Sequence, residues 1–166
     1  MTLSRRHLLA ASSLALPLGA QSQTAWPRQS VRFVVPFAPG GSSDFVARAF
    51  APRLGQLLGQ SVIIENRSGA AGNIGMEVVA KSPADGYTFV VGPNGNVVVN
   101  PSLYAKLPYD VRKDFTFISR LTDGGLVFVV NKDVPAKTLP ELVTWIRQQG
   151  AGRVNYGSYG TGGTGH

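Results

Sequence analysis

The stretch that decides the fold reads VRFVVPFAPGGSSD and spans Val31–Asp44. Its first five residues are β-branched or aromatic apart from Arg32, a composition typical of a buried strand. Pro36 and two glycines then form a turn, and the two serines and Asp44 that follow are candidates for a helix N-cap. A strand that passes through such a turn into a helix is the unit from which parallel α/β sheets are built.

The helix expected after Asp44 carries apolar residues along one face and should end at Gly59, since glycine is the common residue just past a helix end. Pro52 lies inside this helix. It is expected to kink the helix, because proline removes a hydrogen bond and its ring collides with the preceding turn.

The same alternation of strand and helix continues along the chain. Further strands are expected at residues 61–64, 87–91, 115–119, 126–130 and 154–156. Further helices are expected from the cap Asn73 to Ala80, over Pro101–Lys106, and after a capping box of Thr138 and Glu141. This pattern predicts a parallel α/β sheet with both faces covered, whose ligands bind in loops at the carboxyl ends of strands. Three such loops are rich in glycine: residues 36–44, 92–96 and 157–165.

The opening segment is expected to be an export signal. The pair Arg5-Arg6 precedes a charge-free apolar run over residues 8–18, and small residues follow it. The run is shorter than the roughly 20 residues that a transmembrane helix needs. Cleavage is expected after Ser22, with Ala20 and Ala25 as alternatives, and both the general secretory and the twin-arginine routes are open.

Composition and charge exclude several classes of protein. The chain has 166 residues, of which 43% are hydrophobic and 15% charged, so it can form a core and is not a disordered tail. It has no cysteine, which excludes disulfide scaffolds and thiolate metal sites. The formal charge of +7 falls to +5 when Arg5 and Arg6 are removed. Because the remaining cations are spread singly, apart from the adjacent Arg112 and Lys113, a small anionic ligand is a better partner than nucleic acid.

Side chains for catalysis are scarce. The only histidines are His7, in the expected signal, and His166, the last residue. No nucleophile elbow and no metal-ligand spacing is present, so we expect no catalytic residue, no metal and no cofactor. Gly160–Gly165 matches G-x-G-x-x-G after an expected strand, which leaves an exported nucleotide-dependent enzyme as an alternative.

The loop at residues 36–44 supplies backbone donors instead. Two glycines and a helix start present amides with no bulky side chain in the way. A carboxylate placed there would accept amide hydrogen bonds and lie at the positive end of the helix dipole. A tight turn that only connects strand to helix is the other interpretation of this loop.

Several motifs occur in the order that they have in one known family. They are residues 34–44, 65–75 (ENRSGAAGNIG), 83–88 (PADGYT), 100–104 (NPSLY), 107–110 with 114–115, 134–138 and 156–158. From about Trp26 to its last residue the chain resembles Bug-type solute-binding proteins, the extracytoplasmic receptors of tripartite tricarboxylate transport systems.

The resemblance implies a periplasmic-binding-protein type II-like α/β fold, with two lobes and a ligand cleft between them. It implies a periplasmic receptor, a monomer when full length, that captures a dicarboxylate, tricarboxylate, aromatic acid or amino acid for membrane permease subunits and performs no chemistry. On this interpretation residues 1–22 are the signal, 23–124 the first lobe and 125–166 the start of the second. The ligand-binding residues it implies are Phe37, Ala38, Pro39, Gly40, Gly41, Ser42, Asp44, Gly92, Asn94, Ser158, Gly160, Thr161, Thr164 and His166.

Two features depart from the family pattern. Pro52 is unusual in the first helix, and family members are about twice as long as this chain. We therefore expect a chain truncated within its second lobe, with the first lobe lacking its return segments. A nonfunctional fragment is the remaining alternative.

Overall fold

The computed structural model describes residues 26–158 and 160–163, so the expected export signal lies outside the described residues. Its centre is a three-stranded parallel sheet of β1 (Val31–Val35), β2 (Val62–Asn66) and β3 (Thr88–Val90), in the order β2-β1-β3. The predicted parallel α/β sheet is confirmed, and β1 has the bounds that its sequence pattern indicates.

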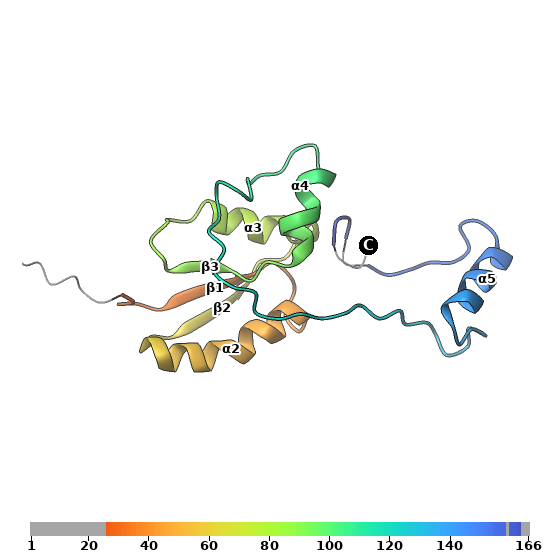
Figure 1. Ribbon diagram of the computed structural model, residues 1–166, viewed down its shortest axis with the longest axis horizontal. Coiled ribbons are helices and arrows are strands. Elements are labelled where there is room, and N and C mark those ends of the chain that lie inside the picture. Colours follow the sequence, from red (N-terminus) through yellow and green to blue (C-terminus); the bar gives the residue numbers. More distant parts are fainter. Residues whose placement is uncertain (1–25, 159, 164–166) are drawn as a thin grey trace, which may run out of the picture.

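Two helices cover the sheet. Helix α2 (Ser42–Leu58) connects β1 to β2, and helix α3 (Asn73–Ala80) lies between β2 and β3. Because β2 and β3 flank β1 on opposite sides, right-handed connections place the two helices on opposite faces. Figure 1 shows α2 and α3 on the two sides of the sheet. We call residues 31–110, which contain this sheet and its helices, the α/β body.

The core of the α/β body is centred on β1. Val31, Val34 and Val35 are at most 1% exposed, and Phe33 packs its ring against that of Phe89 at a centroid distance of 5.5 Å. The helices contribute small or flexible residues to this core, with Ala47 on α2 and Met76 on α3. The central strand is buried from both sides, which explains its nearly continuous apolar sequence.

Helix α2 continues through Pro52 as one helix of 17 residues. It ends where expected, because Gly59 adopts a left-handed conformation with φ of 68°. Its start differs from the prediction: Gly41 is the N-cap, so Asp44 is the third residue of the helix and not its cap. Asn73 likewise begins α3 and does not cap it, since a 3₁₀ turn, η2 (Ala70–Gly72), leads into the helix.

A second helical segment follows β3. It consists of a π-helical turn, η3 (Gly95–Val99), and a short helix, α4 (Asn100–Leu103). The helix predicted at Pro101–Lys106 therefore starts earlier and ends earlier than expected. Near the end of the α/β body, the ring of Tyr109 packs edge-on against Phe115.

The strands predicted at residues 115–119, 126–130 and 154–156 are wrong, because the described chain is not in strands there. A strand needs a neighbour that pairs with its backbone, and the described residues provide none for these segments. The apolar side chains of residues 127–129 are 84–85% exposed.

Helix α5 (Leu139–Gln149) forms as predicted, with both hydrogen bonds of the capping box between Thr138 and Glu141. Figure 1 shows α5 apart from the α/β body. The chain then returns, so that residues 160–163 lie beside α4.

Candidate ligand-binding site at the carboxyl edge of the sheet

Three loops begin at one edge of the sheet. Because β1, β2 and β3 are parallel, the loops that start at Pro36, Arg67 and Val91 all leave from their carboxyl ends. Backbone hydrogen bonds continue past the strands, from Arg67 N to Val35 O and from Val91 N to Val34 O, each 2.9 Å long. This is the edge at which parallel α/β sheets bind ligands.

Asp44 organises the first of these loops. Asp44 is 3% exposed, and its carboxylate accepts hydrogen bonds from Arg48 Nε (2.9 Å), Gly40 N (2.9 Å) and Asn66 Nδ2 (3.0 Å). Hydrogen bonds from Arg48, from the Gly40 amide and from Asn66 hold the pKa of Asp44 far below its usual range. The carboxylate therefore stays charged and folds the loop back onto the start of α2.

Asn66 connects the first loop to the second. It is the last residue of β2, and its Nδ2 also donates to the carbonyl of Phe37 at 3.0 Å. The same amide group thus holds the loop at Phe37 and at Asp44. Sequence reasoning missed Asn66 as a site residue, although it stands within a motif that carries the family resemblance.

These contacts change which amides are open to a ligand. The Gly40 amide, predicted to bind a carboxylate, is already bonded to Asp44. Gly41 and Ser42 lie next to it and are exposed; Gly41 is the N-cap and Ser42 the first residue of the 17-residue helix α2. The dipole of that helix places partial positive charge at these positions. The start of α2 is thus the part of the loop best suited to an anion.

Two glycines allow the loops to approach one another closely. A Cβ atom on Gly75 would lie 2.6 Å from the Cα atom of Pro36. A Cβ atom on Gly72, whose φ is +90°, would lie 2.9 Å from Asn96 Oδ1 and 3.0 Å from Phe37 Cζ. Any larger residue at these positions would push the second loop away from the first and third.

A buried asparagine cluster lies behind the loops. Asn73 Oδ1 accepts hydrogen bonds from Asn96 Nδ2 (3.0 Å), Asn100 Nδ2 (2.7 Å) and Tyr109 Oη (2.9 Å). The three asparagines are at most 5% exposed, and burial raises the pKa of Tyr109. Sequence reasoning missed this cluster. Its one signal was the i, i+4 spacing of Asn96 and Asn100 beside an apolar run of valines.

The structure brings some of the predicted site residues together. The stretch from Phe37 to Ser42 forms the first loop, and Gly92 and Asn94 stand in the third loop. Gly160 approaches the second loop, since a Cβ atom there would lie 2.9 Å from Ala71 Cβ. The remaining predicted residues divide into Ser158 and Thr161, which are described and exposed, and Thr164 and His166, which lie outside the described residues.

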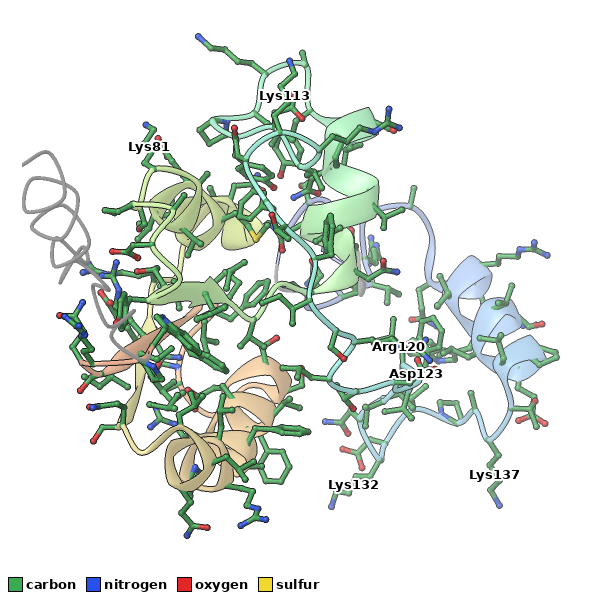
Figure 2. All side chains as sticks on the ribbon, turned by 60° about the vertical axis from the view of Figure 1, so that its left-hand side comes forward. Lys81, Lys113, Arg120, Asp123, Lys132 and Lys137 are labelled. Carbon is green, nitrogen blue, oxygen red and sulfur yellow. The ribbon has the colours of Figure 1, made fainter. Side chains whose placement is uncertain are left out.

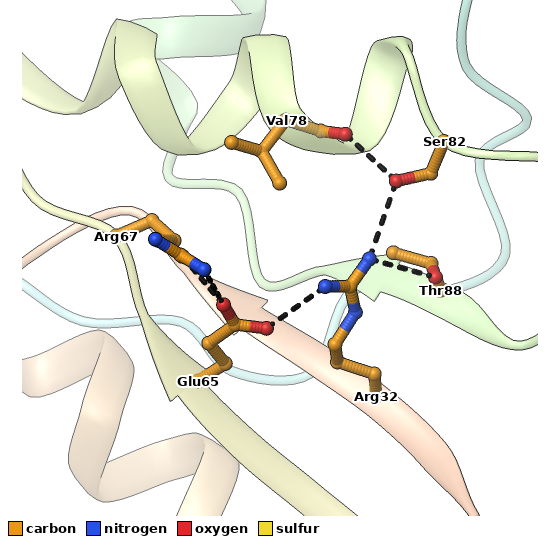
Figure 3. Close-up of polar contacts among 6 residues, drawn as sticks. All are labelled: Arg32, Glu65, Arg67, Val78, Ser82 and Thr88. Atoms are coloured by element: carbon orange, nitrogen blue, oxygen red, sulfur yellow. Dashed lines mark hydrogen bonds and ion pairs between the residues drawn. The ribbon is translucent and has the colours of Figure 1, made fainter.

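The arginines near the sheet are engaged with carboxylates. Arg32 Nη1 pairs with Glu65 Oε2 at 3.0 Å, and Arg67 pairs with the other oxygen of the same carboxylate (Figure 3). Partial burial opposes ionisation of Glu65, but Arg67 and Arg32 outweigh it and lower its pKa. Since Arg48 pairs with Asp44 in the same way, an anion at this edge would rely on backbone amides.

The other labelled cations are spread over the surface. Figure 2 shows Lys81, Lys113, Lys132 and Lys137 on separate parts of the described chain, with Arg120 beside Asp123. These labelled residues do not form a continuous basic surface.

The described residues hold no group of three acidic or histidine side chains suited to a metal ion. Within the same residues, no helix is both long and apolar enough to cross a membrane.

Two surface hollows lie away from the carboxyl edge, one lined by residues from Val130 to Glu141 and the other between α2 and β2. The candidate site is the carboxyl edge of the sheet, where the three loops begin.

Comparison with known proteins identifies relatives. A family described as the tripartite tricarboxylate transporter family receptor matches residues 46–166. A UPF0065 protein of Bordetella pertussis is 36% identical over 157 residues, which cover 93% of this chain and 48% of that protein. Protein BugT of the same species is 38% identical over 136 residues, covering 81% of this chain and 41% of BugT. The chain thus spans about half the length of the curated relatives it matches.

Two solved structures share the fold over part of their length. MatC from Rhodopseudomonas palustris with bound malate is 36% identical with a TM-score of 0.71, over 75% of this chain and 42% of MatC. Rpa4515 from the same species, with adipate, is 38% identical with a TM-score of 0.58, over 75% of this chain and 42% of that protein.

Proposed function

The chain belongs to the tripartite tricarboxylate transporter receptor family, and on that premise we propose that it is a periplasmic receptor for a small carboxylate. The observation that carries the proposal is the first loop. Asp44 and Asn66 hold it so that the exposed start of α2, at Gly41 and Ser42, faces the carboxyl edge of the sheet. The family consists of transport receptors and not enzymes, which removes the alternative of a nucleotide-dependent enzyme.

The ligand class follows from the site and from the relatives. Malate and adipate, bound by the two R. palustris proteins, are both dicarboxylic acids. The site here offers backbone amides at a helix start, and its nearby arginines are paired with Asp44 and Glu65. A carboxylate is the anion that such amides and the helix dipole would accept. We therefore infer that the ligand carries at least one carboxylate, with dicarboxylates as the first candidates.

The arrangement of the whole receptor is part of the proposal. Residues 23–124 belong to a first lobe and residues 125–166 to the start of a second, after an export signal at residues 1–22. The first loop and the loop at residues 92–94 would hold one carboxylate. The segment from Ser158 to His166 would hold the far end of the ligand. Membrane permease subunits would then accept the ligand in the periplasm.

The expected affinity of the first loop alone is modest. A millimolar dissociation constant corresponds to about 4 kcal/mol. Two or three hydrogen bonds to a charged group, at about 1.5–3 kcal/mol each, supply that amount. Binding of malate or adipate to this chain should therefore be detectable in the millimolar range, with the neutral diamide adipamide as a ligand that does not bind.

Substitution of Gly41 tests the proposal. Gly41 has an extended backbone (φ −76°, ψ 170°), and a Cβ atom there would meet only Ala38 O at 3.6 Å, so most residues fit. Gly41→Asp places a carboxylate where the ligand should bind, and like charges a few ångströms apart repel by about 1–4 kcal/mol near a protein surface. We expect malate affinity to fall by about tenfold or more.

The matched control is Gly41→Asn, which has nearly the same shape without the charge. Asp and Asn are comparable N-caps, so both variants should unfold at denaturant midpoints like that of the original chain or slightly higher. Equal malate affinity in the Asp and Asn variants, measured by titration calorimetry, would contradict the proposed site.

A further inference from the structure

A hydrogen bond joins two segments that are far apart in the sequence. Tyr104 is the C-cap that directly follows α4, and its hydroxyl donates to the carbonyl of Thr161 at 2.6 Å. Thr161 stands in a turn, Gly160–Gly163, that is closed by a hydrogen bond from Gly163 N to Gly160 O at 3.0 Å. We call Gly160–Gly163 the glycine turn. Its contact with Tyr104 fixes it against the α/β body.

The glycine turn fits the surface that it touches. A Cβ atom on Gly160 would lie 2.9 Å from Ala71 Cβ, and one on Gly162 would lie 2.1 Å from Asn100 Oδ1 and 3.1 Å from Leu103 Cδ2. Both glycines have positive φ, +114° and +84°. Only glycine therefore allows this backbone to approach η2 and α4 so closely.

One contact opposes the docking. Asn100 is fully buried, and within the described residues its Oδ1 has no hydrogen-bond partner. Gly162 covers this oxygen and offers it no N–H or O–H donor. A buried acceptor without a partner is unfavourable, and water would satisfy it if the turn moved away. The bond from Tyr104 therefore favours the docked turn, and the covered Asn100 oxygen opposes it.

The docked turn lies beside the candidate site. Ala71, which Gly160 approaches, accepts a hydrogen bond from Asn96 Nδ2 at 3.0 Å through its carbonyl. Its neighbour Gly72 is in close contact with Phe37 of the first loop. A continuous set of contacts therefore connects the glycine turn to the loop that is proposed to bind carboxylate.

We propose that Tyr104 is a positioning residue, which holds the glycine turn beside the first loop so that Thr161 and its neighbours can reach the far end of the ligand. This inference rests on the proposed function for the role of the turn, but the docking itself does not depend on a ligand. Tyr104 would set how often the turn is in place, and thereby the affinity for a ligand that spans both loops.

Hydrogen exchange without ligand tests the docking. In Tyr104→Phe, amides of the glycine turn should exchange about fivefold faster, the factor that corresponds to one lost hydrogen bond. In Gly162→Ala the added methyl group collides with Asn100, and exchange should rise by about tenfold or more. Amides of β1 should exchange unchanged in both variants.

Two control variants test whether a change in exchange comes from lost docking or only from the type of substitution. Tyr87→Phe removes a tyrosine hydroxyl elsewhere, one that accepts from Arg28 N. Gly152→Ala has the same unfavourable positive φ (+75°) but open space around its Cβ. Both should leave the glycine turn at its original exchange rate. Unchanged exchange in Tyr104→Phe, or equal effects of the two alanine variants on the turn, would overturn the docking.

Malate titration then separates the two proposals. If Tyr104 positions the turn, Tyr104→Phe lowers malate affinity by about fivefold while the urea midpoint of the α/β body stays the same. If Tyr104→Phe speeds hydrogen exchange in the glycine turn but leaves malate affinity unchanged, the docking is right and the positioning role is wrong. If the original chain binds no malate or adipate while exchange responds as expected, the proposed function fails and the docking stands.

Discussion

Two stretches of the chain have almost the same sequence and opposite surroundings. Residues 31–35 read VRFVV and form the buried central strand β1, whereas residues 126–130 read LVFVV and form no strand. Phe33 is 9% exposed and Phe128 is 85% exposed. The difference lies in their neighbours: β1 is paired with β2 and β3, and no described strand pairs with residues 126–130. Local sequence makes a stretch suitable for a strand, and pairing makes it one.

The largest expected difference between these stretches is in stability. Phe33→Ala should destabilise the α/β body by about 3–5 kcal/mol, the usual cost of removing a buried aromatic ring. Phe128→Ala removes the same atoms from an exposed position and should change the free energy of unfolding by less than about 0.5 kcal/mol. Urea unfolding followed by circular dichroism compares the two. Similar losses would mean that residues 126–130 are buried in solution.

A smaller difference is expected for two glycines. Gly75 faces the backbone of Pro36, and Gly124 has open space around its Cβ. Gly75→Ala should cost about 1–3 kcal/mol, since overpacking against backbone cannot relax easily. Gly124→Ala should leave the unfolding midpoint of the α/β body unchanged. If Gly75→Ala were equally neutral, α3 would not be packed against the end of β1 as closely as described.

The smallest expected effect is on the loss of stability in acid. Arg48, the charged partner of Asp44, is half exposed, so water screens their ion pair and weakens its contribution to stability. The folded state lowers the pKa of Asp44, so its contribution is complete above the unfolded pKa of about 3.9 and is lost as pH falls below it. Between about pH 5 and pH 3 the original chain should therefore lose stability more steeply than Asp44→Asn. Asp123→Asn, with an exposed carboxylate, serves as the control. A slope unchanged in Asp44→Asn would contradict the role given to Asp44.

The sequence predicted those elements that depend on nearby residues. The turn after β1, the end of α2 at Gly59 and the capping box at Thr138 are each decided within a few residues, and all three form. The strand expected at 126–130 requires a distant partner, which its own pattern cannot reveal. Its apolar run is strand-like in composition, but composition alone does not supply the pairing.

The candidate site was predictable in outline. The glycines of the first loop and its place after a strand indicate a binding loop, but they do not reveal that Asp44, a candidate cap by its sequence, bonds the Gly40 amide. The asparagine cluster draws on Asn73, Asn96 and Asn100, which come together only in the folded chain. The pattern of residues along the chain does not predict such contacts between segments that are far apart in the sequence.

The proposed carboxylate site is the start of α2, beside the carboxyl end of β1. The most direct measurement is to follow the backbone amide signals of the chain by nuclear magnetic resonance as malate is added. Binding at this site predicts saturable shifts at Gly41, Ser42 and Ser43, with residues 126–130 unaffected. Saturable shifts confined to another part of the chain, or none at malate concentrations of about 10 mM, well above the millimolar dissociation constant expected, would contradict it.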